Sequence, residues 1–467
     1  MAAALGFEGR LVVLGCGCIG QAVLPLLLRH VMVDPSRIVA IDARGAGREL
    51  FAAAGAACVQ QRLTAHNLDT TLGAYLAPGD FLLNLSVDVS SLALIEWCRA
   101  HDVLYLDTCI EPWAGGYVDA RLPPAERSNY ALREAALALH RAGAPTAVLT
   151  HGANPGLVSH FVKQALLDIA QDSAAAVAAP PTREGWARLA RDLGVRTIHI
   201  AERDTQVGTR RKAIGEFVNT WSVDAFISES CQPAELGWGT HERNWPADAR
   251  RHERGSRASI YLLRPGAATP VYSWTPLAGP QIGYLVTHGE SISIADALTL
   301  GDPANPQYRP TVHYAYHPCD DAMLSLHELA ERQWLPQPRQ CVLKAEIDHG
   351  LDELGVLVMG APRGSYWFGS RLSIEQARAL APHNSATSLQ VAAGVMAGVV
   401  WAIEHPREGV VEPDDMPFER ILALARPYLG EMVGVFTLWT PLANRATLFD
   451  EDLDHGDPWQ FKNFRVQ

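Results

Sequence analysis

The chain has 467 residues, 48% of them hydrophobic and 19% charged, and its formal net charge is −12. This length can support two or more hydrophobic cores, and the composition is ordinary for a globular protein. The negative charge argues against nucleic acid as a partner. The sequence shows neither a long uncharged apolar run nor a leader pattern, so we expect a cytoplasmic protein without a membrane span.

A strand, a glycine loop and a helix follow one another at the start of the chain. The apolar run 11–14 leads into the loop G-C-G-C-I-G at 15–20, and a second apolar run begins at Ala22. The first glycine of such a loop permits a tight turn, the second lets backbone N–H groups approach a pyrophosphate, and the third allows close packing of helix on strand. The predicted cofactor contacts in this loop are Gly15, Gly17, Cys18, Ile19 and Gly20.

A second strand is predicted over 37–41, and it ends in Asp42. In dinucleotide-binding folds an acidic residue about 20 residues after the glycine loop holds a ribose 2′-hydroxyl. The same carboxylate would repel a 2′-phosphate. The sequence therefore favours NAD over NADP as the cofactor.

Strands and helices continue to alternate as far as residue 150. We predict an apolar turn around Cys58, strands over 81–85, 103–106 and 146–150, and helices over 90–99 and 128–141. This order predicts an α/β fold whose N-terminal domain, residues 1–150, is a doubly wound Rossmann domain. Ligands of such sheets bind beyond the carboxyl ends of the strands. We expect the strand ends to border the cofactor crevice with Asn84, Leu85, Ser86, Asp88, Asp107 and Thr108.

Beyond residue 150 the pattern changes to helix and strand blocks with longer loops, which predicts a second, α+β domain over residues 151–467. Its strands are expected to include 197–201, 258–263, 283–286 and 353–357. The segment 388–403 is apolar nearly all round. We therefore expect a buried helix there that returns to the first domain.

Two polar residues stand at ends of predicted elements in the second domain. The turn H-G-A-N-P-G at 151–156 places Asn154 at the edge of the cofactor crevice. Asn154 either orients the nicotinamide or a substrate, or belongs to a turn that only caps the next helix. Glu202 ends the strand that begins at 197, and it is either a site residue or a solvated carboxylate paired with Arg203.

Trp221 and Glu229 lie in one segment, 217–229, that we predict to be part strand and part helix. A tryptophan face beside carboxylates suits a flexible alkylammonium, because it combines cation–π attraction with hydrogen-bonded countercharge. The alternative for Trp221 is an ordinary core position.

His288 and Glu290 follow an apolar strand and would share one side of an extended segment. A histidine titrates near neutrality and a partly desolvated carboxylate can be tuned toward it, so the pair suits proton transfer to and from an amine. A solvent-facing strand end is the alternative. His313 and His317 share a strand face, but no second ligand pair accompanies them, so we predict no metal site.

Taken together, these segments resemble the bacterial homospermidine synthase family, within the saccharopine dehydrogenase-like superfamily. The resemblance covers nearly the whole chain, and several of its motifs are long and unusual in composition. The motifs are G-C-G-C-I-G at 15–20, N-L-S-V-D at 84–88, D-T-C-I-E-P-W at 107–113, G-A-N-P-G at 152–156, H-I-A-E-R-D-T-Q at 199–206, V-N-T-W-S-V at 218–223, Q-P-A-E-L-G-W-G-T at 232–240, T-H-G-E-S-I-S-I-A-D at 287–296 and H-Y-A-Y-H-P-C at 313–319.

The resemblance implies NAD that is held tightly and reused in each cycle, putrescine or spermidine as the amine, and a homodimer formed by the second domain. It implies that hydride passes from putrescine to NAD, ammonia departs, a second putrescine attacks, and hydride returns with no net redox change. Glu290 with His288 would take the ammonium proton. The implied substrate site consists of Asn154, Glu202, Trp221, Glu229, His288 and Glu290.

Two other functions stay open at this point. A carboxynorspermidine or saccharopine-type NAD(P)-dependent dehydrogenase would need arginines that converge on an α-carboxylate, and Arg203 is the nearest candidate. A non-enzymatic NAD-bound sensor would need the glycine loop, but it would not need Trp221 and Glu290 around one cavity.

Overall fold

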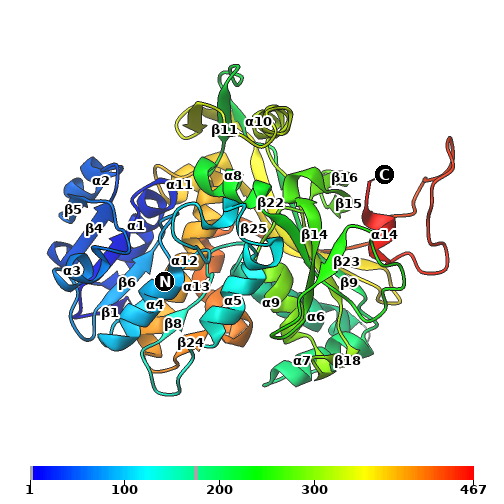
Figure 1. Cartoon of the computed structure of the whole chain (residues 1–467), viewed down its shortest axis with the longest axis horizontal. Coiled ribbons are helices and arrows are strands. Elements are labelled where there is room, and N and C mark those ends of the chain that lie inside the picture. Colours follow the sequence, from blue (N-terminus) through cyan, green and yellow to red (C-terminus); the bar gives the residue numbers. More distant parts are fainter. Residues whose placement is uncertain (1–3, 173–176, 467) are drawn as a thin grey trace.

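The computed structural model describes residues 4–172 and 177–466 and contains two large sheets, one toward each side of Figure 1. Within the described residues the N-terminal sheet has seven strands in the order β24-β8-β7-β6-β2-β4-β5, all paired in parallel. The strands are β2 (Leu11–Leu14), β4 (Ile38–Asp42), β5 (Ala57–Gln60), β6 (Phe81–Asn84), β7 (Leu104–Asp107), β8 (Ala147–Val148) and β24 (Val410–Val411). The predicted fold class is confirmed.

The N-terminal sheet is covered by helices. They are α1 (Cys18–His30), α2 (Arg48–Ala53), α3 (Leu68–Gly73), α4 (Ser91–Ala100) and α5 (Asn129–Leu137). Every residue of β2, β6 and β7 is buried. Continuous apolar strands of this kind are expected where helices cover both faces of a parallel sheet.

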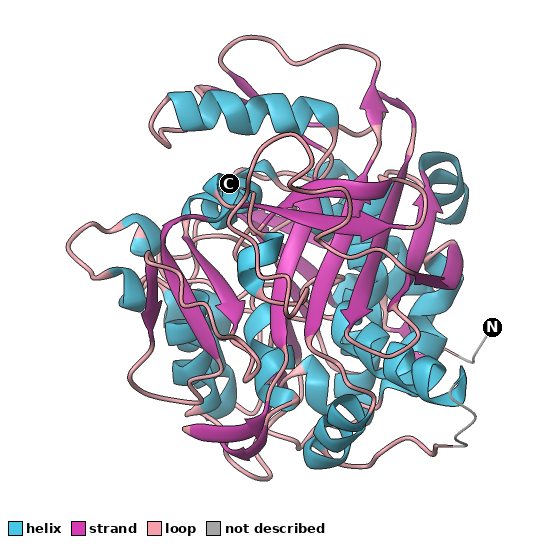
Figure 2. Cartoon of the chain, turned by 90° about the vertical axis from the view of Figure 1, so that its right-hand side faces the viewer, coloured by secondary structure: helices cyan, strands magenta, loops and turns pink. Residues whose placement is uncertain are grey.

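The second sheet is mixed and has ten strands within the described part of the chain. Its main path is β13-β14-β12-β19-β9-β22-β23-β25, and β15 and β16 form a hairpin that pairs with β19. The strands are β9 (Thr197–Asp204), β12 (Pro233–Gly237), β13 (Ala249–Arg251), β14 (Ser259–Pro265), β15 (Pro270–Thr275), β16 (Gly279–Tyr284), β19 (Thr311–His317), β22 (Leu351–Met359), β23 (Ser365–Ser373) and β25 (Glu431–Thr437). Figure 2 shows strands of this sheet running side by side, with helices around them.

Helices and a small lobe complete this half of the molecule. The helices are α6 (Leu157–Asp172), α7 (Arg183–Asp192), α9 (Glu290–Ala297), α11 (Ile374–Leu380), α13 (Phe418–Ala425) and α14 (Phe461–Phe464). The lobe stands at the top of Figure 1 and consists of β11 (Glu216–Asn219), β20 (Arg339–Val342) and α10 (Asp320–Glu331), with α8 (Val223–Cys231) at its base.

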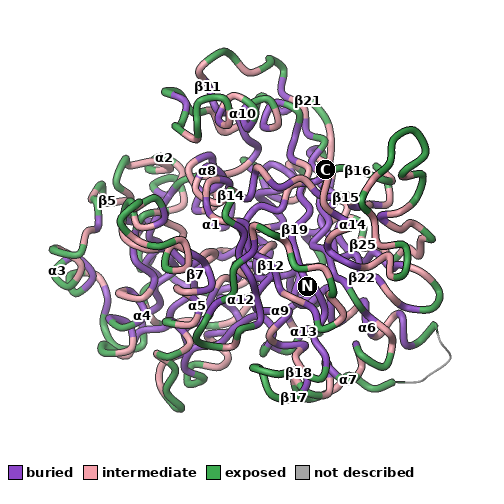
Figure 3. The backbone as a smooth tube through the Cα atoms, turned by 45° about the vertical axis from the view of Figure 1, so that its right-hand side comes forward, coloured by how far each residue is buried: buried purple, intermediate pink, exposed green. Residues whose placement is uncertain are grey.

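The helix α12 (Ala386–Glu404) joins the two halves, as the apolar segment 388–403 predicted. It contacts α1 and β7 of the first half and β22 and β23 of the second. Contrary to expectation, it is long and apolar enough to span a membrane, but 89% of its apolar window is buried inside the protein. Figure 3 shows the buried segments gathered in the interior, with exposed loops around the edge. Such burial is typical of a core helix.

Three local expectations were wrong. The predicted turn around Cys58 is the strand β5, which pairs in parallel with β4. The strand expected over 283–286 is β16, which ends at Tyr284. Glu290 is the first residue of α9, so His288 and Glu290 do not lie on one extended segment. No prediction covered β24, the two-residue edge strand of the N-terminal sheet.

Gly394 tests how closely α12 packs. A Cβ at this position would overlap the carbonyl oxygen of Gly152, in the loop that carries Asn154. We expect Gly394→Ala to lower the free energy of unfolding by about 1–3 kcal/mol, since the backbone must move. Chemical denaturation followed by circular dichroism measures the effect.

Gly73→Ala is the matched control, because a Cβ at the end of α3 would meet nothing within 4 Å. We expect the control to stay within about 0.5 kcal/mol of the wild type. Equal stabilities of the two variants would contradict the packing described for α12.

Candidate active site

The glycine loop lies between β2 and α1 and leaves room for a ligand at one point. Gly15 has a φ of +94°, and a Cβ there would lie 2.6 Å from the carbonyl oxygen of Leu85. A Cβ at Gly20 would overlap the carbonyl oxygen of Gly15. At Gly17, by contrast, a Cβ would meet nothing within 4 Å, and no side chain caps the first N–H groups of α1. The loop therefore fits a pyrophosphate at the start of α1.

Asp42 holds the loop that follows β4 against the glycine loop. Its Oδ2 accepts a hydrogen bond from the N–H of Cys16 at 2.8 Å. Its Oδ1 accepts hydrogen bonds from the N–H groups of Arg44 at 2.8 Å and Ala46 at 3.2 Å. A carboxylate has about four acceptor positions. One position is left for a ribose hydroxyl.

Asn84 and Asp107 are buried and do not line the crevice. Asn84 Oδ1 accepts hydrogen bonds from the N–H and hydroxyl of Ser86 at 3.2 and 2.6 Å. Asp107 accepts hydrogen bonds from the N–H of Thr150 at 2.6 Å and the hydroxyl of Tyr105 at 2.8 Å. Burial raises the pKa of Asp107 to about 6. Both residues hold the loops at the strand ends in place. Asp88 is exposed on its loop.

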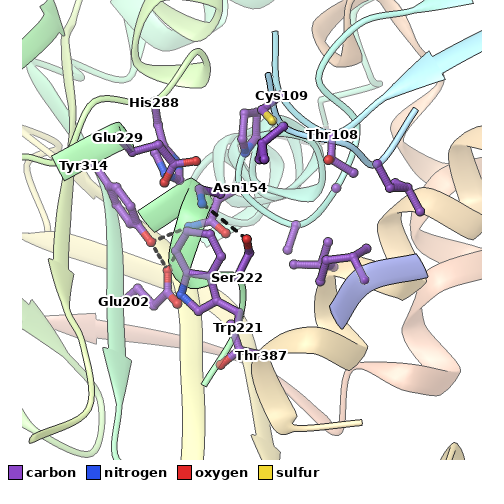
Figure 4. Close-up of a pocket in the computed structure, with 18 of the residues that line it drawn as sticks. Thr108, Cys109, Asn154, Glu202, Trp221, Ser222, Glu229, His288, Tyr314 and Thr387 are labelled. Carbon is purple, nitrogen blue, oxygen red and sulfur yellow. Dashed lines mark hydrogen bonds and ion pairs between the residues drawn. The ribbon is translucent and has the colours of Figure 1, made fainter. Parts of the chain in front are cut away.

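A cavity opens where the strand-end loops of the first sheet face the second sheet (Figure 4). Its cofactor-side walls include Ile19, Leu85, Ser86 and Thr108, four of the predicted cofactor residues. Its other walls include Asn154, Glu202, Trp221, Glu229 and His288, five of the six predicted substrate residues. Thus one cavity joins the dinucleotide loop to the predicted substrate groups.

Asn154, Glu202 and Tyr314 form a hydrogen-bonded group on one wall (Figure 4). The amide nitrogen of Asn154 donates to Glu202 Oε2 at 2.8 Å and contacts the Tyr314 hydroxyl at 2.6 Å. The Tyr314 hydroxyl also donates to Glu202 Oε2. Asn154 is therefore more than a turn residue, because its side chain positions the carboxylate of Glu202.

Burial raises the pKa of Glu202 to about 7, although the hydrogen bond from Tyr314 acts in the opposite direction. Asp204, two residues along β9, adds a further increase. Asp352 on β22 is paired with Asp204 in the sheet register, and burial raises its pKa well above the ordinary value. Glu202 is therefore a buried carboxyl group that titrates near neutral pH, which is suitable for a general base.

Trp221 precedes α8 and lines the cavity. Its indole N–H donates to the hydroxyl of Tyr316 at 3.2 Å. Tyr316 in turn stacks on Tyr314, with ring centroids 5.3 Å apart and planes at 1°. These contacts fix the edge of the indole, and its position on the wall suits a cation–π contact.

His288 lies between two carboxylates. Its Nε2 is 2.9 Å from Glu229 Oε2, and its Nδ1 is 3.3 Å from Glu290 Oε1. Burial lowers the pKa of His288, but the charges of Glu229 and Glu290 outweigh it and raise the pKa well above the ordinary value. His288 is therefore an imidazolium at neutral pH. Glu290 is 1% exposed and lies behind His288, outside the cavity wall.

Several residues of the site were not predicted. Tyr314 and Tyr316 lie in a segment that we considered only for its histidines, and Asp204, Asp352 and Thr387 were not predicted as site residues. The alternation of Tyr314 and Tyr316 on β19 was the available signal, because it places both rings on one face. Nothing local to Asp352 or Thr387 indicates a site, since only the pairing of β22 with β9 and the packing of α12 bring them near Glu202.

No lysine or arginine lines this cavity in the described parts of the chain. Arg203 follows Glu202 on β9 and lines a different cavity, with Gln281 and His317. Lys163 on α6 is buried, and its Nζ donates to the backbone carbonyls of Asp414 and Met416. Among the described residues, the cavity lining thus offers carboxylates and aromatic rings, and His288 is its one cationic side chain.

Comparisons with known proteins define the class first. A model described as "Saccharopine dehydrogenase NADP binding domain" matches residues 11–148, and one described as "Saccharopine dehydrogenase C-terminal domain" matches residues 152–437. The chain is therefore a two-part protein of the saccharopine dehydrogenase type.

More similar relatives define the family. The chain is 53% identical to the homospermidine synthase of Blastochloris viridis over 466 residues, covering 98% of each chain. It is 50% identical to that of Mesorhizobium japonicum, covering 98% of this chain and 96% of the relative. A crystal structure of the Legionella pneumophila homospermidine synthase in complex with NAD is 47% identical and superposes with a TM-score of 0.93 over 99% of each chain. The chain belongs to the homospermidine synthase family.

The charge on His288 depends on its two carboxylate neighbours. Glu229→Gln removes the carboxylate 2.9 Å from Nε2, so we expect the pKa of His288 to fall. Titration followed by NMR with labelled histidine measures it in the absence of substrate. Glu184→Gln on the exposed surface of α7 is the control and should leave this titration unchanged. An unchanged pKa in Glu229→Gln would contradict the imidazolium assignment.

Proposed function

We propose that this chain is a homospermidine synthase that transfers an aminobutyl group from putrescine or spermidine to putrescine, with NAD as an internal hydride carrier. The observation that carries the proposal is the single cavity between a dinucleotide loop and a set of carboxylates and aromatic rings. Such a lining suits a diammonium substrate, because each cationic end finds a countercharge and the apolar stem finds the indole.

The glycine loop would hold the pyrophosphate of NAD at Gly17, and Asp42 would accept a hydrogen bond from the adenosine ribose. Leu85, Ser86 and Thr108 would lie along the nicotinamide half, since they line the cavity on that side. Bound NAD would supply a hydride acceptor for the first half of the reaction and a hydride donor for the second.

Glu202 is the group we assign to remove the proton from the amine that is to be oxidised. Its pKa of about 7 allows a substantial fraction of carboxylate at neutral pH, and Asn154 and Tyr314 fix its orientation. A neutral amine is needed before hydride can leave the adjacent carbon. Glu290 then serves a different purpose from the one expected, because it sits behind His288 and stabilises the imidazolium.

His288 and Trp221 act on the cationic stages. The imidazolium of His288 is a source of the proton that the departing amine needs to leave as ammonia. The face of Trp221 stabilises the iminium carbon and nitrogen by cation–π attraction. Glu229 lines the cavity beside His288 and provides countercharge for the second amine.

We further propose that residues 1–150 form the NAD-binding unit and that residues 151–467 bind substrate and form a homodimer in the cytoplasm. A net dehydrogenase is disfavoured, because within the described residues no arginine reaches the cavity. An NAD-bound sensor is disfavoured, because Trp221, Glu229 and His288 converge on one space.

Turnover per cofactor tests the function directly. With putrescine in excess and NAD well below the product formed, we expect many molecules of homospermidine and ammonia for each NAD, without accumulation of NADH absorbance. A net dehydrogenase would give product only in proportion to the cofactor consumed. That stoichiometry would overturn the proposal.

The general base predicts a pH dependence. Since Glu202 must be deprotonated, kcat/KM should fall as pH decreases through about 7. Glu202→Gln should lower kcat by about 100-fold or more, and its kcat/KM should no longer fall as pH decreases through about 7. Gln281→Ala, which removes a side chain that donates to the backbone carbonyl of Glu202 instead of its carboxylate, is the control and should keep this decrease. If kcat/KM of Glu202→Gln still fell as pH decreased through about 7, a residue other than Glu202 would be the base.

A further inference from the structure

One arginine beside the cofactor loop has no place in the function proposed above, on which the following inference rests. Arg44 lies two residues after Asp42. An acidic residue at the end of this strand selects the ribose 2′-hydroxyl of NAD, whereas an arginine nearby accommodates the 2′-phosphate of NADP. The chain carries both signals. The matching family model also describes an NADP binding domain, while the similar crystal structure holds NAD.

The backbone around Arg44 is held at the mouth of the dinucleotide site. Asp42 accepts hydrogen bonds from the N–H groups of Arg44 and Ala46. Gly47 has a φ of +71°, and a Cβ there would lie 2.9 Å from the carbonyl oxygen of Cys16, so this loop packs on the glycine loop. The side chain of Arg44 therefore starts beside the position at which Asp42 would read the ribose.

The guanidinium of Arg44 is held by the opposite wall. Its NH2 group donates to Asp224 Oδ2 at 3.0 Å. Asp224 Oδ1 accepts a second hydrogen bond at 2.7 Å from the side chain of Gln340 on β20. The Asp224 side chain is 33% exposed and that of Arg44 is 73% exposed. Asp224 is thus the more buried partner and accepts two hydrogen bonds, whereas Arg44 is the more exposed one.

The lobe that contains β20 approaches the first half at a second point. Lys344 lies just beyond β20, and its Nζ donates to Gln21 Oε1 on α1 at 3.2 Å. This contact places the lobe across the start of α1, where the pyrophosphate would lie. Asp224 belongs to the first turn of α8, whose later residue Glu229 lines the substrate cavity. One helix therefore faces both the adenosine end and the substrate end of the site.

We propose that Asp224 determines cofactor choice by holding Arg44 away from the 2′ position. When Arg44 is paired with Asp224, the charged group beside the ribose is the carboxylate of Asp42, which repels the 2′-phosphate of NADP. Without Asp224, the guanidinium is free to meet a 2′-phosphate. Asp224 is a specificity-determining residue that acts through Arg44 and needs no contact with substrate.

Equilibrium binding of NAD and NADP tests this without turnover. In Asp224→Ala the affinity for NADP relative to NAD should rise about twofold to fivefold, the size expected of one partly solvated charge contact. Asp224→Asn keeps the size of the side chain and should show the same direction of change. In Asp224→Ala combined with Arg44→Ala the gain should disappear, since no guanidinium remains.

Asp320→Ala is the matched control. It removes one negative charge from the same lobe, where Asp320 lies near Arg211 instead of the cofactor loop. A gain in Asp320→Ala equal to that in Asp224→Ala would overturn the inference in favour of a general charge effect. A gain that survives in the double variant would also overturn it, because Arg48 or another cation would then bind the phosphate.

The same measurements separate this inference from the proposed function. If the wild type binds neither nucleotide, the proposed function and the inference both fail. If the wild type binds NAD but Asp224→Ala leaves the ratio of affinities unchanged, only the role of Asp224 fails.

Discussion

The site depends on one constraint: the carboxyl group of Glu202 is buried away from water. Glu202 sits on a central strand of the second sheet and is 1% exposed, so its charge must be balanced by donors from the protein. Asn154 and Tyr314 supply those donors from two other segments. Ionised Glu202 is therefore stable only when β19 of the second sheet and the loop that follows β8 are both in place.

The same principle explains the pair of carboxylates around His288. A buried imidazolium is unfavourable by itself, and two buried carboxylates are unfavourable beside each other. Together they form a charged group with a net negative charge, which attracts an alkylammonium, and no lysine or arginine is among the described residues that line the cavity. The electrostatics of the site thus come from acidic side chains: burial raises the pKa of Glu202 to about 7, and the charges of Glu229 and Glu290 keep a proton on His288.

Much of the fold was predictable from the sequence. The strand, loop and helix at residues 11–28 have strong local signals, and the apolar segment 388–403 indicated a helix that returns to the first half. Residues of the cavity wall were predictable where the sequence has a local pattern, as with Asn154, Glu202 and Trp221. Glu290 was misplaced because alternation was extended past Tyr284, where the chain turns into α9. Asp352 and Asp224 could not be found, since only pairing and packing between distant segments bring them to Glu202 and Arg44.

The edge strand β24 has a consequence for how the molecule is made. Its two residues, Val410 and Val411, pair with β8 to complete the N-terminal sheet, and α12 just before it covers β7 and α1. During synthesis the first 150 residues leave the ribosome long before these segments exist. Until the second half has emerged, the edge strand β8 lacks its partner β24, and the apolar surface that α12 covers stays exposed. Completion of the nucleotide-binding half is consequently a late event in the synthesis of the chain.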